Sequence, residues 1–178
     1  MVACGIPAGS VDVRFEDDMQ EDIVWVARHV TSSQMTCVAQ ASITTDYFVF
    51  FRDEAEQRVY DPIYQQLSNE AEVANARDWL RARHLLATLP TPEAGKPLSE
   101  YTASVEEFCG VKRGALLVAV DEHTITYNRE GLGRMTPEGI VDRAADDAQF
   151  DCILNATSAV DLASHGIVLG FVIGGGSR

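Results

Sequence analysis

Lysine is scarce in this chain of 178 residues: only Lys96 and Lys112 are present, and all basic residues together number 14 against 27 acidic ones. The formal net charge is therefore −13. A surface this negative repels nucleic-acid phosphates and anionic lipid headgroups, and it attracts basic partners and cations. We therefore expect no direct binding of nucleic acid and no membrane association. A compositional bias of the source, or adaptation to salt, explains the same charge equally well.

Long hydrophobic runs are also missing. The stretch 167–173 is far too short to span a bilayer, and the first seven residues have neither a basic start nor an apolar run. These features lead us to expect a cytoplasmic protein.

Closely spaced cysteine pairs are absent as well. Cys4, Cys37, Cys109 and Cys152 lie tens of residues apart, without a C-x-x-C pair. Structural zinc sites need closely spaced ligands, and disulfide frameworks are typical of shorter, cysteine-rich chains. We therefore predict reduced thiols in the core, no metal site and no cofactor.

The chain length suits one domain, residues 1–178, and the proline-flanked stretch 90–97 is its best candidate for an internal linker. Strand hairpins mixed with helices, without a steady βαβ rhythm, indicate an α+β fold. We expect a mixed, mainly antiparallel sheet of five to seven strands with three to four helices packed against it.

The local patterns place these elements along the chain. Apolar alternation or β-favouring runs predict strands at 11–15, 47–51, 58–60, 115–120, 124–127, 152–154 and 167–173. Residues 47–51 are apolar without alternation, as in a central strand. Caps and apolar stripes predict helices at 69–88, 99–109 and 136–150. Residues 23–30 suit one side of a helix, with a strand over 23–26 as the alternative, and residues 35–43 suit a strand or a short helix.

A glycine-containing loop between a predicted strand and a predicted helix is a candidate anion site. Glycines allow backbone amides to approach an anion, the helix dipole favours negative charge, and arginines supply bidentate hydrogen bonds. The spacing matches neither a dinucleotide fingerprint nor a P-loop, so a simple turn is the competing interpretation. The candidate residues are Arg129, Gly131, Gly133, Arg134 and Thr136.

A thiol nucleophile is a second candidate. Cys37 near a helix start would have a stabilised thiolate, His123 would serve as its base, and Asp121 would orient the imidazole. This order of residues suits a cysteine hydrolase, although no local signature of such an enzyme surrounds Cys37. A buried cysteine and an edge-strand histidine explain the pair more simply.

The sequence contains no coherent set of catalytic residues. The carboxylates along 138–151 are explained by the solvent-exposed face of a helix. The sequence therefore favours a non-enzymatic protein that docks on a basic surface of a protein partner, as an inhibitor or adaptor does. A cysteine hydrolase is the alternative, and an anion- or nucleotide-binding domain is the third hypothesis.

Overall fold

The computed structural model describes residues 1–18, 20–45, 47–136, 139–141 and 143–170. Within them the chain is an α+β protein that divides into two compact units, Met1–Ala71 and Glu72–Arg178. The strands form two three-stranded sheets and a two-stranded ribbon in place of the single larger sheet expected from the sequence. The unit boundary falls inside a helix, α2 (Glu54–Ala82), whereas the stretch 90–97 lies within the second unit.

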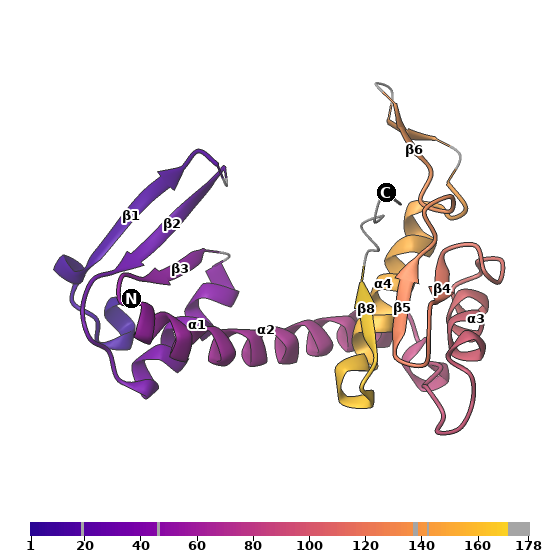
Figure 1. Cartoon of the computed structure of the whole chain (residues 1–178), viewed down its shortest axis with the longest axis horizontal. Helices are drawn as coiled ribbons and strands as arrows, with labels where there is room; N and C mark the ends of the chain where they lie inside the picture. Colours follow the sequence, from indigo (N-terminus) through magenta and orange to yellow (C-terminus); the bar gives the residue numbers. More distant parts are fainter. Residues whose placement is uncertain (19, 46, 137–138, 142, 171–178) are drawn as a thin grey trace, which may run out of the picture. The chain divides into compact units, whose positions relative to one another are not determined.

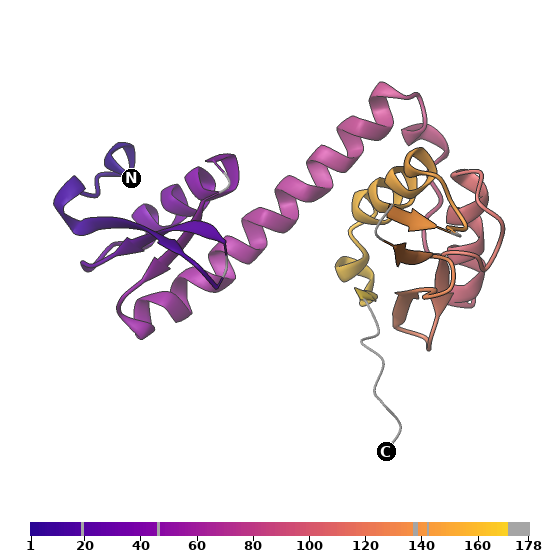
Figure 2. The same ribbon diagram turned by 90° about the horizontal axis from the view of Figure 1, so that it is seen from above.

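The first unit is a three-stranded sheet with helices on one side. Strands β1 (Val11–Glu16) and β2 (Glu21–Val26) form an antiparallel hairpin, and β3 (Phe48–Phe51) joins β2 in parallel. The helix α1 (Ser32–Thr45) makes the crossover between β2 and β3 that a parallel pair needs. Figures 1 and 2 show α1 and the start of α2 on the same side of this sheet. Two short 3-10 turns, η1 (Val2–Cys4) and η2 (Ala8–Ser10), precede β1.

The core of this unit lies between the sheet and the helices. Val24, Val26, Val49 and Phe51 share one face of the sheet by register, and all four are buried. They pack in one cluster with residues of α1 and α2, among them Met35, Val38 and Tyr60. Burial of this apolar face is what stabilises a sheet of only three strands.

Several expectations for the first unit need correction. Of the two possibilities left open for residues 23–26, the structure has the strand, as part of β2. Of the two left open for residues 35–43, it has the helix, as part of α1. The strand 48–51 is real but lies at the sheet edge, with the order β1-β2-β3. Residues 58–60 are helical, because Asp53 caps α2 by accepting from the backbone of Ala55 (2.7 Å), and the helix continues through Pro62.

The second unit combines the remainder of α2 with a second small sheet. Helix α3 (Leu98–Phe108) follows the 3-10 turn η3 (Leu86–Thr88) and ends before Gly110, which adopts the left-handed conformation predicted for a terminating glycine. Strands β4 (Leu117–Ala119) and β5 (Thr124–Tyr127) form the expected antiparallel hairpin, and β8 (Val168–Gly170) pairs with β5 in parallel. Its core has one large cluster that includes Val105, Ile125 and Ile153, and a smaller one formed by Ala76, Leu80 and Ala159.

The segment between β5 and β8 differs from the prediction. Instead of a helix over 136–150, the chain forms an antiparallel ribbon of β6 (Arg134–Thr136) and β7 (Gly139–Val141). The helix begins later, as α4 (Asp147–Ala159), and it contains residues 152–154, which were predicted as a strand. The turn η4 (Leu162–His165) then leads into β8.

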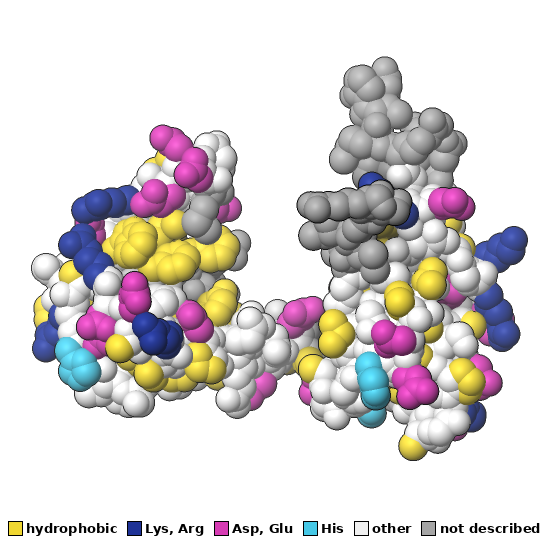
Figure 3. All heavy atoms as spheres, viewed as in Figure 1, with side chains coloured by type: hydrophobic (Ala, Val, Ile, Leu, Met, Phe, Trp, Pro, Cys, Tyr) yellow, Lys and Arg dark blue, Asp and Glu magenta, His cyan; other side chains and the backbone are white. Residues whose placement is uncertain are grey.

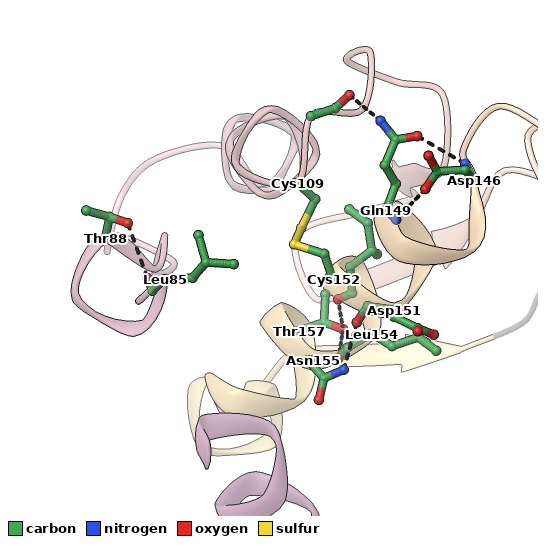
Figure 4. Close-up of a disulfide and its surroundings, with 12 residues drawn as sticks. Leu85, Thr88, Cys109, Asp146, Gln149, Asp151, Cys152, Leu154, Asn155 and Thr157 are labelled. Atoms are coloured by element: carbon green, nitrogen blue, oxygen red, sulfur yellow. Dashed lines mark hydrogen bonds between the residues drawn. A yellow bond between two sulfur atoms is a disulfide. The ribbon is translucent and has the colours of Figure 1, made fainter. Parts of the chain in front are cut away.

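The start of α4 is fixed by a reciprocal cap. Asp146 accepts a hydrogen bond from the backbone N–H of Gln149 (2.8 Å), and the Gln149 side chain accepts one from the backbone of Asp146 (3.0 Å). The Gln149 amide also donates to the carbonyl oxygen of Gly110 (2.7 Å), beside the disulfide that joins Cys109 to Cys152 (Figure 4). The end of α3 and the first turns of α4 are therefore held together.

Candidate functional site

All four cysteines are paired in disulfides, which corrects the prediction of reduced thiols. Cys4 is bonded to Cys37 within the first unit, and Cys109 is bonded to Cys152 within the second. The pairs are 33 and 43 residues apart, and sequence spacing alone does not specify such a pairing.

The pairing removes the basis of the cysteine hydrolase hypothesis. A nucleophilic cysteine must be a thiolate, and the sulfur of Cys37 is bonded to another sulfur. Cys37 and His123 also belong to different units.

Asp121 has a local structural role beside His123. Its carboxylate accepts a hydrogen bond from the backbone N–H of His123 (2.8 Å), and this bond, together with one from the Thr124 side chain, lowers the pKa of Asp121. The contact is made to the backbone and not to the imidazole. It stabilises the turn between β4 and β5.

The loop that was predicted to bind an anion, residues 129–136, lies between other elements than expected. Thr136 ends the strand β6 and does not cap a helix, so the loop does not lead directly into a helix as expected. Arg129 is exposed, and only the backbone placement of Arg134 and Thr136 lies within the described structure. Gly131 and Gly133, by contrast, line a cavity of about 310 Å³.

The position of Gly131 requires a glycine, because its backbone lies against the backbone of Ala115. A Cβ atom at Gly131 would lie 1.8 Å from the carbonyl oxygen of Ala115, where no side chain fits. The backbone N–H of Ala144 donates to the carbonyl oxygen of Gly131 (2.9 Å), and Gly133 has a φ of 79°. The glycines therefore serve close packing and a left-handed turn, and they form one wall of an apolar cavity.

The clearest surface feature of the first unit is the β1–β2 hairpin, which extends beyond β3 (Figure 1). Val13 and Phe15 on β1 are 56% and 57% exposed, far more than apolar side chains of a buried sheet face. On the opposite face, Trp25 and Phe50 stack with ring centroids 5.4 Å apart, next to the exposed Phe48.

Five carboxylates gather at the end of the same hairpin: Glu16, Asp17, Asp18, Glu21 and Asp22. Within the described residues none of them pairs with a basic side chain, whereas Asp12, nearer the base, is held by Arg14 and Arg52. Figure 3 shows acidic side chains at the end of the hairpin and a group of hydrophobic side chains next to them. We call the hairpin from Val11 to Val26 the acidic arm.

The acidic arm was only partly visible in the sequence. Five carboxylates within seven positions are an obvious run, but the exposure of Val13 and Phe15 depends on how far the hairpin extends past the helices. An alternating strand pattern predicts that one face is covered, and here the far half of that face is not.

Other site chemistries find little support among the described residues. No group of three His, Cys, Asp or Glu side chains is placed to hold a metal ion there. No helix in the described part of the chain is long and apolar enough to cross a membrane. Comparisons with protein-family models, with curated proteins and with solved structures give no match to this chain.

Proposed function

We propose that this protein binds a basic surface of another protein through the acidic arm. The observation that carries the proposal is the presence of unpaired carboxylates and exposed apolar side chains on the same hairpin. Exposed apolar side chains bordered by like charges are typical of protein-binding surfaces, in which the apolar contacts give affinity and the charges give rate and selectivity.

The charge distribution supports the first unit as the binding part. Residues 1–71 contain twelve carboxylates against four arginines and no lysine, and therefore carry a formal charge of −8 out of −13 for the whole chain. The negative potential is thus concentrated in less than half of the sequence. A basic partner is drawn to this unit by long-range attraction, which salt screens.

The arrangement of the strands suggests how the partner binds. β1 is an edge strand, so the backbone groups on its outer side have no neighbouring strand among the described residues. An extended basic segment of a partner pairs with such an edge while its side chains contact Val13 and Phe15. We therefore propose an extended segment rich in arginine or lysine, with apolar residues between the charges, as the occupant.

The two disulfides bear on where this function operates. Disulfides persist in oxidising surroundings and are rare in reducing ones. We therefore propose an oxidising compartment in place of the cytoplasm, and a partner that is present there.

The test uses a ten-residue peptide that alternates arginine and valine, labelled with a fluorophore, and measures binding to the full chain by anisotropy. The quadruple variant Asp17→Asn, Asp18→Asn, Glu21→Gln and Asp22→Asn removes four charges from the arm. Glu100→Gln, Glu122→Gln, Glu130→Gln and Asp151→Asn together remove four exposed charges from the second unit as a matched control.

The proposal predicts at least a tenfold loss of affinity for the arm variant, a small loss for the control variant, and a steep fall in affinity with salt. Phe15→Ser weakens binding further without unfolding the protein, since its side chain is exposed. Equal losses of affinity in both quadruple variants would show that binding depends on net charge alone, and would overturn the assignment to the acidic arm. Binding that is insensitive to salt would overturn the electrostatic basis.

A further inference from the structure

The second unit contains a cavity that the proposed protein-binding function does not use. It has a volume of about 310 Å³, at the lower end of the range for small-molecule sites. As far as the described residues show, its lining is apolar apart from one charged side chain, Arg143. The lining residues are Leu116, Gly131, Leu132, Gly133, Arg143, Ala145 and Phe150.

The cavity is built from fixed parts of the fold. The turn at Gly131 is pressed against the backbone of Ala115 and is held by the N–H of Ala144. Phe150 lies in the first turns of α4, where its ring contacts that of Tyr127 with centroids 6.0 Å apart. A preformed apolar cavity favours a ligand with an apolar body, because little ordering is needed on binding.

Arg143 gives this cavity a preference for negative charge. Its guanidinium pairs with the carboxylate of Asp147, and the two side chains are 34% and 83% exposed. A guanidinium has five N–H donors, so one exposed carboxylate leaves donors for a second anion or is displaced by it. Among the residues that the structure describes, the lining has no other ionisable side chain. The backbone N–H of Gln149 at the start of α4 is taken by Asp146.

We infer that this cavity binds a small molecule with an apolar body and a single carboxylate, which Arg143 recognises. A phosphate ester suits it less, because a doubly charged group needs more than one basic partner and the remaining lining is apolar. The site lies wholly in the second unit, so it is independent of binding by the acidic arm.

The experiment measures binding of 1-naphthaleneacetate and of its neutral isostere, 1-naphthaleneacetamide, to the full chain by calorimetry. These two probes have the same shape and differ by one charge. We expect the carboxylate to bind at least tenfold more tightly than the amide, since hydrogen bonds to an ionised acceptor are about twice as strong as neutral ones. Equal affinities, or no heat from either probe, would overturn the inference.

Three variants test the named residues. Arg143→Gln makes the two probes bind alike, and Asp147→Asn, which removes the competing carboxylate, raises the affinity for the acid. Leu132→Trp fills the cavity and abolishes binding of both probes. Thermal melting shows whether Leu132→Trp is folded; unchanged binding by a folded Leu132→Trp protein would place the ligand elsewhere and overturn the site.

Arg113→Gln is the matched control for the loss of an arginine. Arg113 is exposed, pairs with Glu107 in the same unit and does not line the cavity. Arg113→Gln is expected to leave the preference for the carboxylate probe over the amide probe unchanged. A loss as large as that in Arg143→Gln would show that the probe responds to net charge alone, and the inference would fail.

Discussion

The carboxylate of Glu106 on α3 accepts a hydrogen bond from the backbone N–H of Leu116 at 2.6 Å, inside the core of the second unit. The same side chain also accepts from Leu117 (2.9 Å) and Gly114, and it is fully buried. Three backbone donors thus compensate the burial of one carboxylate. Glu106 fixes the start of β4, and Leu116 in turn forms part of the cavity wall.

Replacing Glu106 by glutamine is expected to destabilise the protein by about 2–3 kcal/mol, because the buried amide nitrogen cannot accept from the backbone and one of the three backbone N–H groups loses its partner. Urea denaturation followed by circular dichroism measures the change. Glu107→Gln is the control: its carboxylate is exposed and pairs with Arg113 in solvent, so its loss is expected to change stability little. Equal effects of the two variants would contradict the structural role of Glu106.

Removing the Cys4–Cys37 bridge with serine at both positions is expected to destabilise the protein by about 3–4 kcal/mol, as loop-closure entropy predicts for a sequence separation of 33. Hydrogen exchange should quicken in Met1–Ala71 more than in the second unit. The reverse pattern is expected for the Cys109–Cys152 pair. Detection of free thiols in the unfolded wild-type protein without reductant would contradict both bridges.

Substituting Gly131 by alanine is expected to cost about 3 kcal/mol or more, since the new Cβ has to displace the backbone of Ala115. Gly170→Ala is the matched change in the same unit, because nothing lies within 4 Å of a Cβ at that position. The melting temperatures of the two variants, each compared with that of the wild-type protein, measure the difference. A shift of similar size in both would show that backbone contact at Gly131 is not the cause.

Alkaline pH should destabilise the first unit through Tyr60. Burial raises the pKa of its phenol from 10.0 to about 12, so the unfolded chain releases this proton first. The contribution to stability is complete below pH 10 and is lost as the pH rises toward 12. Unfolding measured between pH 9 and 12 should become less pH-dependent in Tyr60→Phe, and an unchanged slope would refute the assignment.

The elements whose signals are local were predicted well from the sequence. Gly110 ends α3 and the turn at Asp121 joins β4 to β5, because cap and turn chemistry depend on a few neighbouring residues. The strand predicted at 58–60 was wrong, because these residues lie in α2, a capped helix that continues through Pro62 despite the missing backbone donor. The central position predicted for 47–51 was also wrong: apolar residues on both faces indicate a central strand, but here the face of Phe48 and Phe50 is only partly covered.

The candidate sites depended on tertiary relationships that no local pattern contains. Gly131 and Gly133 were found, but as an anion loop rather than as the wall of an apolar cavity. Arg143 was placed in mid-helix by the prediction, so its position at the cavity was not foreseen. The pairing of the cysteines likewise depends on which segments the fold brings together.

The order of the two disulfides along the chain bears on how the protein is made. Four cysteines allow three pairings, and the one adopted joins the first to the second and the third to the fourth. Synthesis from the N-terminus completes Cys4 and Cys37 before Cys109 is added. If oxidation takes place during synthesis, in the oxidising compartment proposed above, these two cysteines have only each other as partners, and the adopted pairing needs no later exchange of disulfides.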